Sequence, residues 1–292
     1  MDRDVSPSAG PPPALTPTSL RSLAARHGIR PRKALGQHFL IESSLARRIT
    51  ELAGVGPGDR VVEVGPGLGS LTVALAESGA EVLAVEVDPA LVPALEETLS
   101  GRARVRVVVD DAVRLDWGAL LRGERWVMVA NLPYNVAVPL VMRVLEAEPR
   151  VRRLLVMVQR EVGERLAAGP GDDQYGAVSV RVAYRADAKV ARAVSRSVFW
   201  PRPNVDSVLV LLERRPPPVR VDEDALWAVV REAFAQRRKT IRGALVRLGL
   251  SREAAGRVLD ACAIPPLARA EELDLAAFAC LANTMTTEMG ST

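Results

Sequence analysis

The sequence is short of lysine, of aromatic residues and of long apolar runs. Lysine occurs only at positions 33, 189 and 239, and aromatic residues make up 4% of the chain. None of the apolar runs is long enough to cross a bilayer, which argues against a membrane-spanning protein. With 48% hydrophobic and 25% charged residues, the composition is that of an ordinary globular protein. The length of 292 residues allows one large domain, but it favours a large domain with a smaller one attached.

Cysteine is also scarce. Cys262 and Cys280 each stand singly in an apolar helical pattern, without a partner at the spacing of metal ligands or redox pairs. The N-terminus lacks the charged and then apolar pattern of a secretion signal. We therefore expect reduced core cysteines in a cytoplasmic protein that holds no metal.

Arginine supplies most of the positive charge. It accounts for 36 of the 39 basic residues, in a chain with a net charge of +4 and a pI near 9.5. Arginine binds phosphate with two parallel hydrogen bonds and stacks on bases, which suits an RNA partner. Arginine-rich codon usage is the simpler cause of the overall bias, so the places where arginines cluster carry more weight than their number.

The N-terminal stretch is rich in proline and poor in apolar residues. We expect residues 1–30 to form a disordered tail, with at most a short helix over residues 18–27 that ends at Gly28. Two cations, a small polar cluster and a bulky apolar pair then follow over residues 32–40. This segment could form a lid over an anionic or polar ligand, but taken alone it is better explained as a loop that packs Phe39 and Leu40 into the core.

From residue 59 onward, short apolar runs alternate with helical segments, as in a parallel sheet covered on both faces. The first predicted strand, residues 60–64, runs into Gly65-Pro66-Gly67-Leu68-Gly69-Ser70, and a helix follows over residues 71–76. Glycine permits a tight turn, and the start of a helix offers free N–H donors. The turn therefore predicts a ligand at the carboxyl end of this strand.

The next strand, residues 81–85, narrows the choice of ligand. It ends at Glu86, which lies 21 residues after Gly65, the place for a carboxylate that accepts the hydroxyls of an adenosine ribose. The glycine spacing is G-x-G-x-G, and Pro66 removes one N–H donor that a diphosphate would need. A nucleoside cofactor without phosphate, such as S-adenosylmethionine, fits better.

Two further strand ends point to the same edge of the sheet. Residues 105–109 end at Asp110 and Asp111, and Asp111 is placed to accept the adenine amino group. Residues 126–130 end at the tetrapeptide Asn131-Leu132-Pro133-Tyr134. This tetrapeptide alone is as typical of a capped strand and turn as of a functional site. Beside three cofactor-facing strand ends, it is better explained as a site.

At this point the sequence resembles a known family, the ribosomal RNA adenine N6,N6-dimethyltransferases of the small-subunit type. The motifs that carry the resemblance are Gly36-Gln37-His38-Phe39-Leu40, Glu63-Val64-Gly65-Pro66-Gly67-Leu68-Gly69 and Asn131-Leu132-Pro133-Tyr134-Asn135. It continues through Phe199–Ser207, Phe234–Arg242 and Arg269–Leu273, and covers the chain from about residue 30 to its end.

The resemblance implies an α/β fold: a Rossmann-like S-adenosylmethionine methyltransferase domain with a seven-stranded mixed sheet, and a small all-α C-terminal domain. We expect the tail at 1–30, the methyltransferase domain at 31–215 and the helical domain at 216–292. The fifth strand is expected at 151–159 and the last two at 188–194 and 208–212, the last antiparallel. Residues 175–184 alternate like a strand, but the family has a helix there, which we adopt.

The resemblance also assigns site residues. Those implied to bind S-adenosylmethionine are His38, Leu40, Gly65, Glu86, Asp111 and Asn131. Those implied to serve catalysis are Asn131, Pro133, Tyr134 and Phe199. Many members have Asn at the position of His38; both side chains can donate a hydrogen bond, so we expect binding to persist.

The chemistry explains these assignments. An exocyclic adenine amine is a poor nucleophile because its lone pair is delocalised into the ring. Acceptors on the amine protons, such as the Asn131 side-chain oxygen and a backbone carbonyl near Pro133, favour the pyramidal nitrogen of the transition state. Tyr134 is expected to stack on the extruded base and Phe199 to contact its other face; a rigid loop anchor is the alternative for Phe199.

The C-terminal part is predicted to be helical. Asp222 should cap a helix over residues 223–235, and a second helix is expected over residues 236–248. Arg238 and Arg242 would share one face of that second helix. Charged faces are usually just solvated, but beside an RNA-modifying domain we expect contact with rRNA phosphates. The residues proposed for this contact are Arg237, Arg238, Lys239 and Arg242.

The expected function is S-adenosylmethionine-dependent dimethylation of two adjacent adenosines in the 3′-terminal hairpin loop of 16S rRNA, in the small ribosomal subunit or its precursor. We expect a cytoplasmic monomer that contacts no membrane. The alternatives are a 23S rRNA adenine N6-methyltransferase of the macrolide-resistance type, a noncatalytic RNA-binding assembly or transcription factor on the same fold, and, more distantly, a dinucleotide oxidoreductase.

Overall fold

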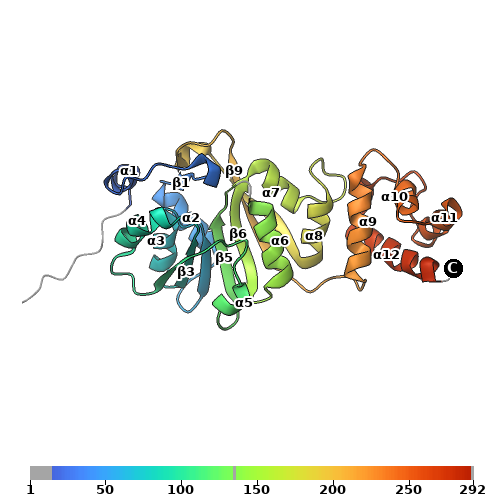
Figure 1. The fold of residues 1–292 in the computed structure, drawn as a ribbon, viewed down its shortest axis with the longest axis horizontal. Helices are drawn as coiled ribbons and strands as arrows, with labels where there is room; N and C mark the ends of the chain where they lie inside the picture. The colour runs from blue at the N-terminus through green and yellow to red at the C-terminus, as the bar shows by residue number, and fades with distance from the viewer. Residues whose placement is uncertain (1–14, 134–135, 291–292) are drawn as a thin grey trace, which may run out of the picture.

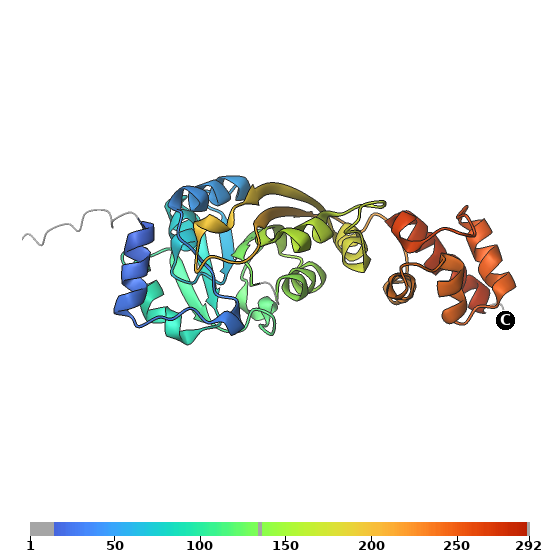
Figure 2. The same cartoon turned by 90° about the horizontal axis from the view of Figure 1, so that it is seen from above.

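The molecule has an α/β part and a helical part that lie end to end (Figures 1 and 2). The structure is a computed structural model, and it describes residues 15–133 and 136–290. In Figure 2 the chain passes from the sheet to the last four helices through a narrow connection.

A seven-stranded mixed sheet forms the centre of the α/β part, which confirms the predicted fold class. Five neighbouring strands are parallel, and β9 runs antiparallel between β6 and β7. In spatial order the strands are β4 (Val105–Val109), β3 (Glu81–Glu86), β2 (Arg60–Val64), β5 (Trp126–Asn131), β6 (Val151–Gln159), β9 (Ser207–Arg214) and β7 (Ala186–Val194).

Helices cover both faces of this sheet, which explains why its central strands are mainly apolar. Val62 and Val64 pack in the core under α6, whereas Val61 packs in the core under α2 and α3. The helices of this part are α2 (Ser43–Ala53), α3 (Ser70–Glu77), α4 (Val92–Leu99), α5 (Trp117–Leu120), α6 (Ala137–Ala147), α7 (Arg160–Ala167) and α8 (Ala177–Arg185). Short 3₁₀ turns are η1 (Lys33–Leu35), η2 (Pro89–Leu91), η3 (Arg196–Val198) and η4 (Ala270–Glu272).

Helix α8 resolves the ambiguous valine pattern. Val182 packs in the core of the sheet, whereas Val180 and Tyr184 pack in the core of the helical part. A helix that is buried on two sides places apolar residues at more positions than a one-sided amphipathic helix does. The alternation at residues 178–182 therefore comes from double burial and not from a strand.

The N-terminal helix α1 (Pro17–Arg26) is part of the folded body. Thr16 caps it by accepting a hydrogen bond from the Ser19 N–H at 3.1 Å. Its buried residues Leu20 and Leu23 pack with Phe39 and Leu91. The short helix expected at residues 18–27 is confirmed. Its expected place in a disordered tail is wrong, because the apolar face of the helix is buried. Residues 1–14 lie outside the described part.

A second, two-stranded sheet was not expected from the sequence. Strand β1 (Phe39–Leu40) pairs antiparallel with β8 (Phe199–Trp200), and Leu40 lies opposite Phe199. The Ile41 N–H extends the pairing by donating to the Val198 carbonyl at 3.0 Å. This pairing joins two segments that are distant in sequence, at the edge of the candidate site.

The helical part contains α9 (Glu223–Ala235), α10 (Ile241–Arg247), α11 (Arg252–Ala261) and α12 (Leu275–Gly290). Asp222 caps α9 as predicted, through a 2.9 Å hydrogen bond from the Ala225 N–H. Tyr175 from the loop before α8 is buried in the core of these helices, and its hydroxyl donates to the Leu273 carbonyl at 2.8 Å. The cores of the two parts thus meet at α8.

The predicted second helix, residues 236–248, is wrong at its start. Helix α10 begins only at Ile241, because residues 236–240 form a turn that pairs Thr240 with Arg269. The Ile241 N–H donates to the Ala268 carbonyl at 2.9 Å and not to a preceding helical turn. Arg238 lies before the helix, so it does not share a helical face with Arg242.

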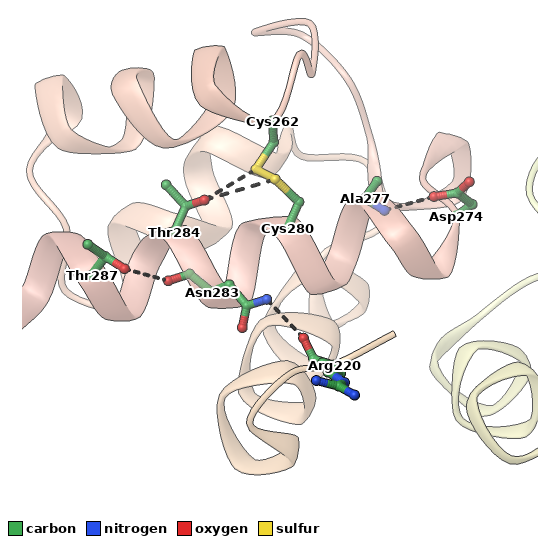
Figure 3. The surroundings of a disulfide bond; sticks show 8 residues. All are labelled: Arg220, Cys262, Asp274, Ala277, Cys280, Asn283, Thr284 and Thr287. Atoms are coloured by element: carbon green, nitrogen blue, oxygen red, sulfur yellow. Dashed lines mark hydrogen bonds between the residues drawn. A yellow bond between two sulfur atoms is a disulfide. The ribbon is translucent and has the colours of Figure 1, made fainter. Parts of the chain in front are cut away.

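The prediction of two reduced cysteines is also wrong. Cys262 follows the last residue of α11 and Cys280 lies on α12, and the two form a disulfide with their Cα atoms 5.8 Å apart (Figure 3). The Thr284 hydroxyl lies 3.6 Å from the sulfur of Cys262. The 18-residue spacing gave no sign of this pairing, because only the antiparallel return of α12 brings the two positions together.

We predict that this disulfide stabilises the helical part. Closing a loop of this length removes unfolded-state entropy equivalent to about 3 kcal/mol. Cys262→Ser, or treatment of the wild type with reductant, should lower the free energy of unfolding measured in urea. In the Cys262→Ser variant, reductant should have no further effect. Equal stability of oxidised and reduced wild type would contradict this prediction.

Candidate active site

The carboxyl ends of β2, β3, β4 and β5 surround a cavity of about 230 Å³. The sequence-predicted residues that it brings together are His38, Gly65, Glu86, Asp111, Asn131, Pro133 and Phe199. Leu40 is not on this cavity, but it is buried and lines an adjoining void of about 30 Å³ with His38, Gly65 and Asn131. Tyr134 lies outside the described residues.

The glycine turn after β2 is packed too closely for side chains. Gly65 has a φ of +72°, and its N–H donates to the Val85 carbonyl at 2.9 Å. Gly67 has a φ of +57°, and a Cβ atom there would lie 2.8 Å from Cδ1 of Phe39. The turn therefore needs glycine both for its backbone conformation and for its contact with β1.

Glu86 ends β3 with its carboxylate held by the backbone. Its Oε2 accepts the Gly67 N–H at 3.1 Å, and its Oε1 accepts the Asp88 N–H at 2.9 Å. The side chain is nearly buried, and this burial raises the pKa of Glu86, although the two backbone hydrogen bonds oppose the shift. Each carboxylate oxygen can accept a second hydrogen bond, so Glu86 can still bind ribose hydroxyls.

Asp111 follows β4 on the same edge of the cavity. Its Oδ1 accepts the Val113 N–H at 2.9 Å, and its Oδ2 lies 3.6 Å from Nε of Arg114. Ala112, Val113 and Leu91 supply apolar wall beside it. An acceptor next to apolar side chains suits the amino group and ring of an adenine.

Asn131 is held in one orientation at the end of β5. Its Nδ2 donates to the His38 carbonyl at 3.0 Å, so the side-chain oxygen is the free end of the amide. The His38 ring donates from Nδ1 to the Pro201 carbonyl at 2.7 Å. Asn131 is therefore fixed by the same segment that pairs with β8. His38 serves as a scaffold for this arrangement through both its ring and its carbonyl.

Of the backbone carbonyls near Pro133 that could accept a hydrogen bond from the target amine, that of Pro133 itself is already in use. The Pro133 carbonyl already accepts the N–H groups of Val136 and Ala137, at 3.2 and 3.1 Å, where α6 begins.

Phe199 is 4% exposed, lines the cavity and packs within the core under α2 and α3. It therefore acts as a core residue that presents one surface to the cavity.

Glu63 is a site residue that the sequence reasoning did not single out. It is 1% exposed and borders the small void with Ser70, and among the described residues neither its Oε2 nor the Ser70 hydroxyl has a hydrogen-bond partner. Burial raises the pKa of Glu63 to about 8, and repulsion from the Glu86 carboxylate adds to this shift. An acid inside the otherwise apolar strand at residues 60–64 was the available signal.

These residues fit S-adenosylmethionine. Glu86 offers acceptors for the ribose, Asp111 and its neighbours suit the adenine, and the void beside Gly65 is bordered by the unpartnered oxygens of Glu63 and Ser70.

Within residues 15–133 and 136–290, no group of three or more His, Cys, Asp or Glu side chains could hold a metal ion. In that same part of the chain, no helix combines the length and apolar character that crossing a membrane requires.

The four predicted RNA-binding residues are all exposed, and Arg237 also makes contacts within the protein. Arg237 donates to the carbonyls of Tyr175 and Asp173, at 2.7 and 3.3 Å, so it ties the helical part to the loop before α8. Arg238, Lys239 and Arg242 are exposed. Arg237 thus combines an internal contact with an exposed side chain.

We predict that Glu63 makes stability depend on pH. The folded state keeps the Glu63 proton up to about pH 8, whereas the unfolded state loses it near 4.5, so stability falls as the pH rises between these values. Glu63→Gln should remove this term, so the stability of the variant should gain on wild type by about 1.4 kcal/mol per pH unit in that window. Urea denaturation from pH 5 to 8 measures this, with the exposed Glu81→Gln as control. Parallel curves for wild type and Glu63→Gln would refute the prediction.

The comparisons with known proteins agree with this geometry. The family model described as ribosomal RNA adenine dimethylase matches residues 28–286. Proteins named ribosomal RNA small subunit methyltransferase A are similar to this chain. The protein from Thermobifida fusca is 51% identical, over 92% of this chain and 95% of its own length. The one from Moorella thermoacetica is 44% identical, over 92% of this chain and 98% of its own.

Two solved structures share the fold over most of the chain. A dimethyladenosine transferase from Plasmodium falciparum superposes with a TM-score of 0.76 at 24% identity, covering 86% of this chain and 98% of that one. The 23S rRNA methyltransferase ErmE superposes with a TM-score of 0.68 at 26% identity, covering 85% and 99%. Because the family model spans most of its length and its relatives match it from end to end, the chain belongs to the ribosomal RNA adenine dimethylase family, whose members are S-adenosylmethionine-dependent methyltransferases.

Proposed function

We propose that this protein dimethylates the N6 amines of two adjacent adenosines in the 3′-terminal hairpin loop of 16S rRNA, within the small ribosomal subunit or its precursor. The observation that carries the proposal is the Asn131 amide, which the His38 carbonyl orients at a cavity that also contains Glu86 and Asp111. The similarity to proteins named for the small subunit, at 44–51% identity, supports the choice of substrate.

The chain's residues would orient and polarise the target amine. When bound, S-adenosylmethionine supplies the electrophilic methyl group. The side-chain oxygen of Asn131 accepts a hydrogen bond from one amine N–H, and the Leu132 carbonyl accepts one from the other, because the Pro133 carbonyl already accepts the N–H groups of Val136 and Ala137. Both acceptors favour a pyramidal nitrogen and stabilise the positive charge that develops on it. The methylated nitrogen then releases an acidic proton, so no strong base is needed.

A large-subunit substrate is the main alternative, since ErmE has the same fold. Incubating purified small and large subunits with radiolabelled S-adenosylmethionine distinguishes the two. We expect label in the small subunit and, by mass spectrometry, dimethyladenosine at two adjacent positions. Label confined to the large subunit would overturn the proposal, and absence of label in both would favour a noncatalytic assembly factor. We further propose a cytoplasmic monomer, which sedimentation of the purified chain tests.

We predict that Asn131→Ala abolishes methyl transfer. Removing a preorganised hydrogen-bonding group from a transition state typically costs about 10²–10³ in rate. Binding of the rRNA substrate should change by less than about threefold, because most affinity for nucleic acid comes from phosphate contacts. Asn204→Ala, at an exposed position, is the control. Turnover close to that of wild type would rule out the role of Asn131.

We also propose that Arg238, Lys239 and Arg242 contact rRNA phosphates, on the strength of their exposure beside one another in sequence. Reversing two of these charges, in Arg238→Glu/Lys239→Glu, should weaken RNA binding and reduce the dependence of affinity on salt by about one to two counterions. The matched control is Arg122→Glu/Arg125→Glu, exposed before the amino end of β5 and so at the opposite edge of the sheet. Equal weakening by both pairs would contradict a specific contact.

A further inference from the structure

Asp88 is a buried carboxylate beside the cofactor cavity that the proposed chemistry does not use. It is 3% exposed and lies two residues after Glu86, where η2 begins. Its Oδ1 accepts the Ala90 N–H at 3.1 Å and lies 3.3 Å from Nη1 of Arg32. Its Oδ2 accepts a hydrogen bond from Nε2 of Gln37 at 2.8 Å. Two of these partners thus come from the N-terminal segment, far away in sequence.

Residues 32–38, here called the N-terminal loop, form one wall of the cavity. Leu35, Gly36, Gln37 and His38 all line it. Two hydrogen bonds between Gln37 and Arg32 close the loop on itself. The side-chain Oε1 of Gln37 accepts the Arg32 main-chain N–H at 2.8 Å, and the main-chain N–H of Gln37 donates to the Arg32 carbonyl at 3.3 Å. The Gln37 side chain is therefore the piece that joins this wall to Asp88.

The main chain of Asp88 contacts Glu86, the carboxylate that is proposed to bind the ribose. Its N–H donates to Oε1 of Glu86 at 2.9 Å. Leu91, at the end of η2, is buried and also lines the cavity. One residue thus contacts the Glu86 carboxylate through its backbone and the N-terminal loop through its side chain.

The two contacts between Asp88 and the loop differ in strength. The Arg32 side chain is 59% exposed, so its ion pair with Asp88 is screened by water and contributes little. The bond from Gln37 is shorter, partly buried and made to a charged acceptor, the kind of hydrogen bond that is strongest in proteins. Closure of the loop therefore depends mainly on Gln37 and Asp88.

We propose that Asp88 is a positioning residue that holds the N-terminal loop closed over bound S-adenosylmethionine through Gln37. It touches neither the reacting atoms nor the cofactor. Its effect is to slow release of the cofactor, whereas the pairing of β1 with β8 holds the segment next to His38 independently of Asp88. The proposal requires that this cavity binds S-adenosylmethionine, and it does not depend on which rRNA is methylated.

A swap of donor and acceptor tests the contact. Asp88→Asn retains an oxygen for the Ala90 N–H but turns an NH₂ group toward Gln37, which also donates. Gln37→Glu alone places two carboxylates together. In the double variant Asp88→Asn/Gln37→Glu, the carboxylate introduced at position 37 can accept from the amide introduced at position 88. It can still accept the Arg32 N–H as well, so the bond forms again in the reverse direction. We expect each single variant to weaken S-adenosylmethionine binding about tenfold, and the double variant to recover to within about threefold of wild type.

Calorimetry with S-adenosylmethionine and no RNA gives these affinities, and steady-state kinetics should show a raised KM for the cofactor with little change in kcat. Asp59→Asn is the control: it makes the same change at a carboxylate that accepts the Gly56 N–H before the amino end of β2, and the variant should bind the cofactor as wild type does. Losses that add in the double variant, or a fall in kcat at unchanged KM, would overturn the proposal. If wild type itself fails to bind S-adenosylmethionine, the cofactor assignment fails, and this inference fails with it. If cofactor binds but rRNA is not methylated, only the proposed function fails.

Discussion

The parallel pairing of β2 between β3 and β5 is the constraint on which the site depends. In this register Val64 lies beside both Val85 and Ala130, so the next residues of all three strands emerge at the same edge of the sheet. Gly65, Glu86 and Asn131 are those residues. Polar groups that are distant in sequence thus meet at one cavity because parallel strands end together, as in other open α/β sheets.

The N-terminal segment completes the cavity from outside the sheet. It is attached at three points: α1 packs against the body, Phe39 and Leu40 pair with β8, and Gln37 bonds to Asp88. His38 lies between these attachments, so its carbonyl can hold the Asn131 amide in place. Catalytic geometry at the end of β5 consequently depends on a segment that precedes β2 in the chain.

The helical part is joined to the sheet by more than its linker. Tyr175 is buried in the helical core, and Arg237 donates to the carbonyls of the loop that precedes α8. These contacts restrict how far the exposed cations Arg238 and Lys239 can move relative to the cavity. A surface that binds rRNA phosphates can position a target adenosine only if it is held in this way. Arg237 therefore helps to hold the exposed cations next to it in place.

The sequence by itself determined the alternation of strands and helices, the fold class and the strand-end residues Gly65, Glu86, Asp111 and Asn131 that meet at the cavity. These follow from local signals: buried strands are mainly apolar, glycine permits the turn after Val64, and acids lie at or just after strand ends. It also identified the family, because the motifs around Gly65 and Asn131 are contiguous in the chain.

Tertiary structure alone decided the features that join distant segments. The pairing of Leu40 with Phe199, the bond from Gln37 to Asp88 and the disulfide between Cys262 and Cys280 leave no periodic pattern in the sequence. The start of α10 was set by the pairing of Thr240 with Arg269, which overrode local helix propensity. Glu63 acquires its raised pKa only because folding buries it beside Glu86, away from water. Such contacts depend on the path of the chain in space, which local sequence does not encode.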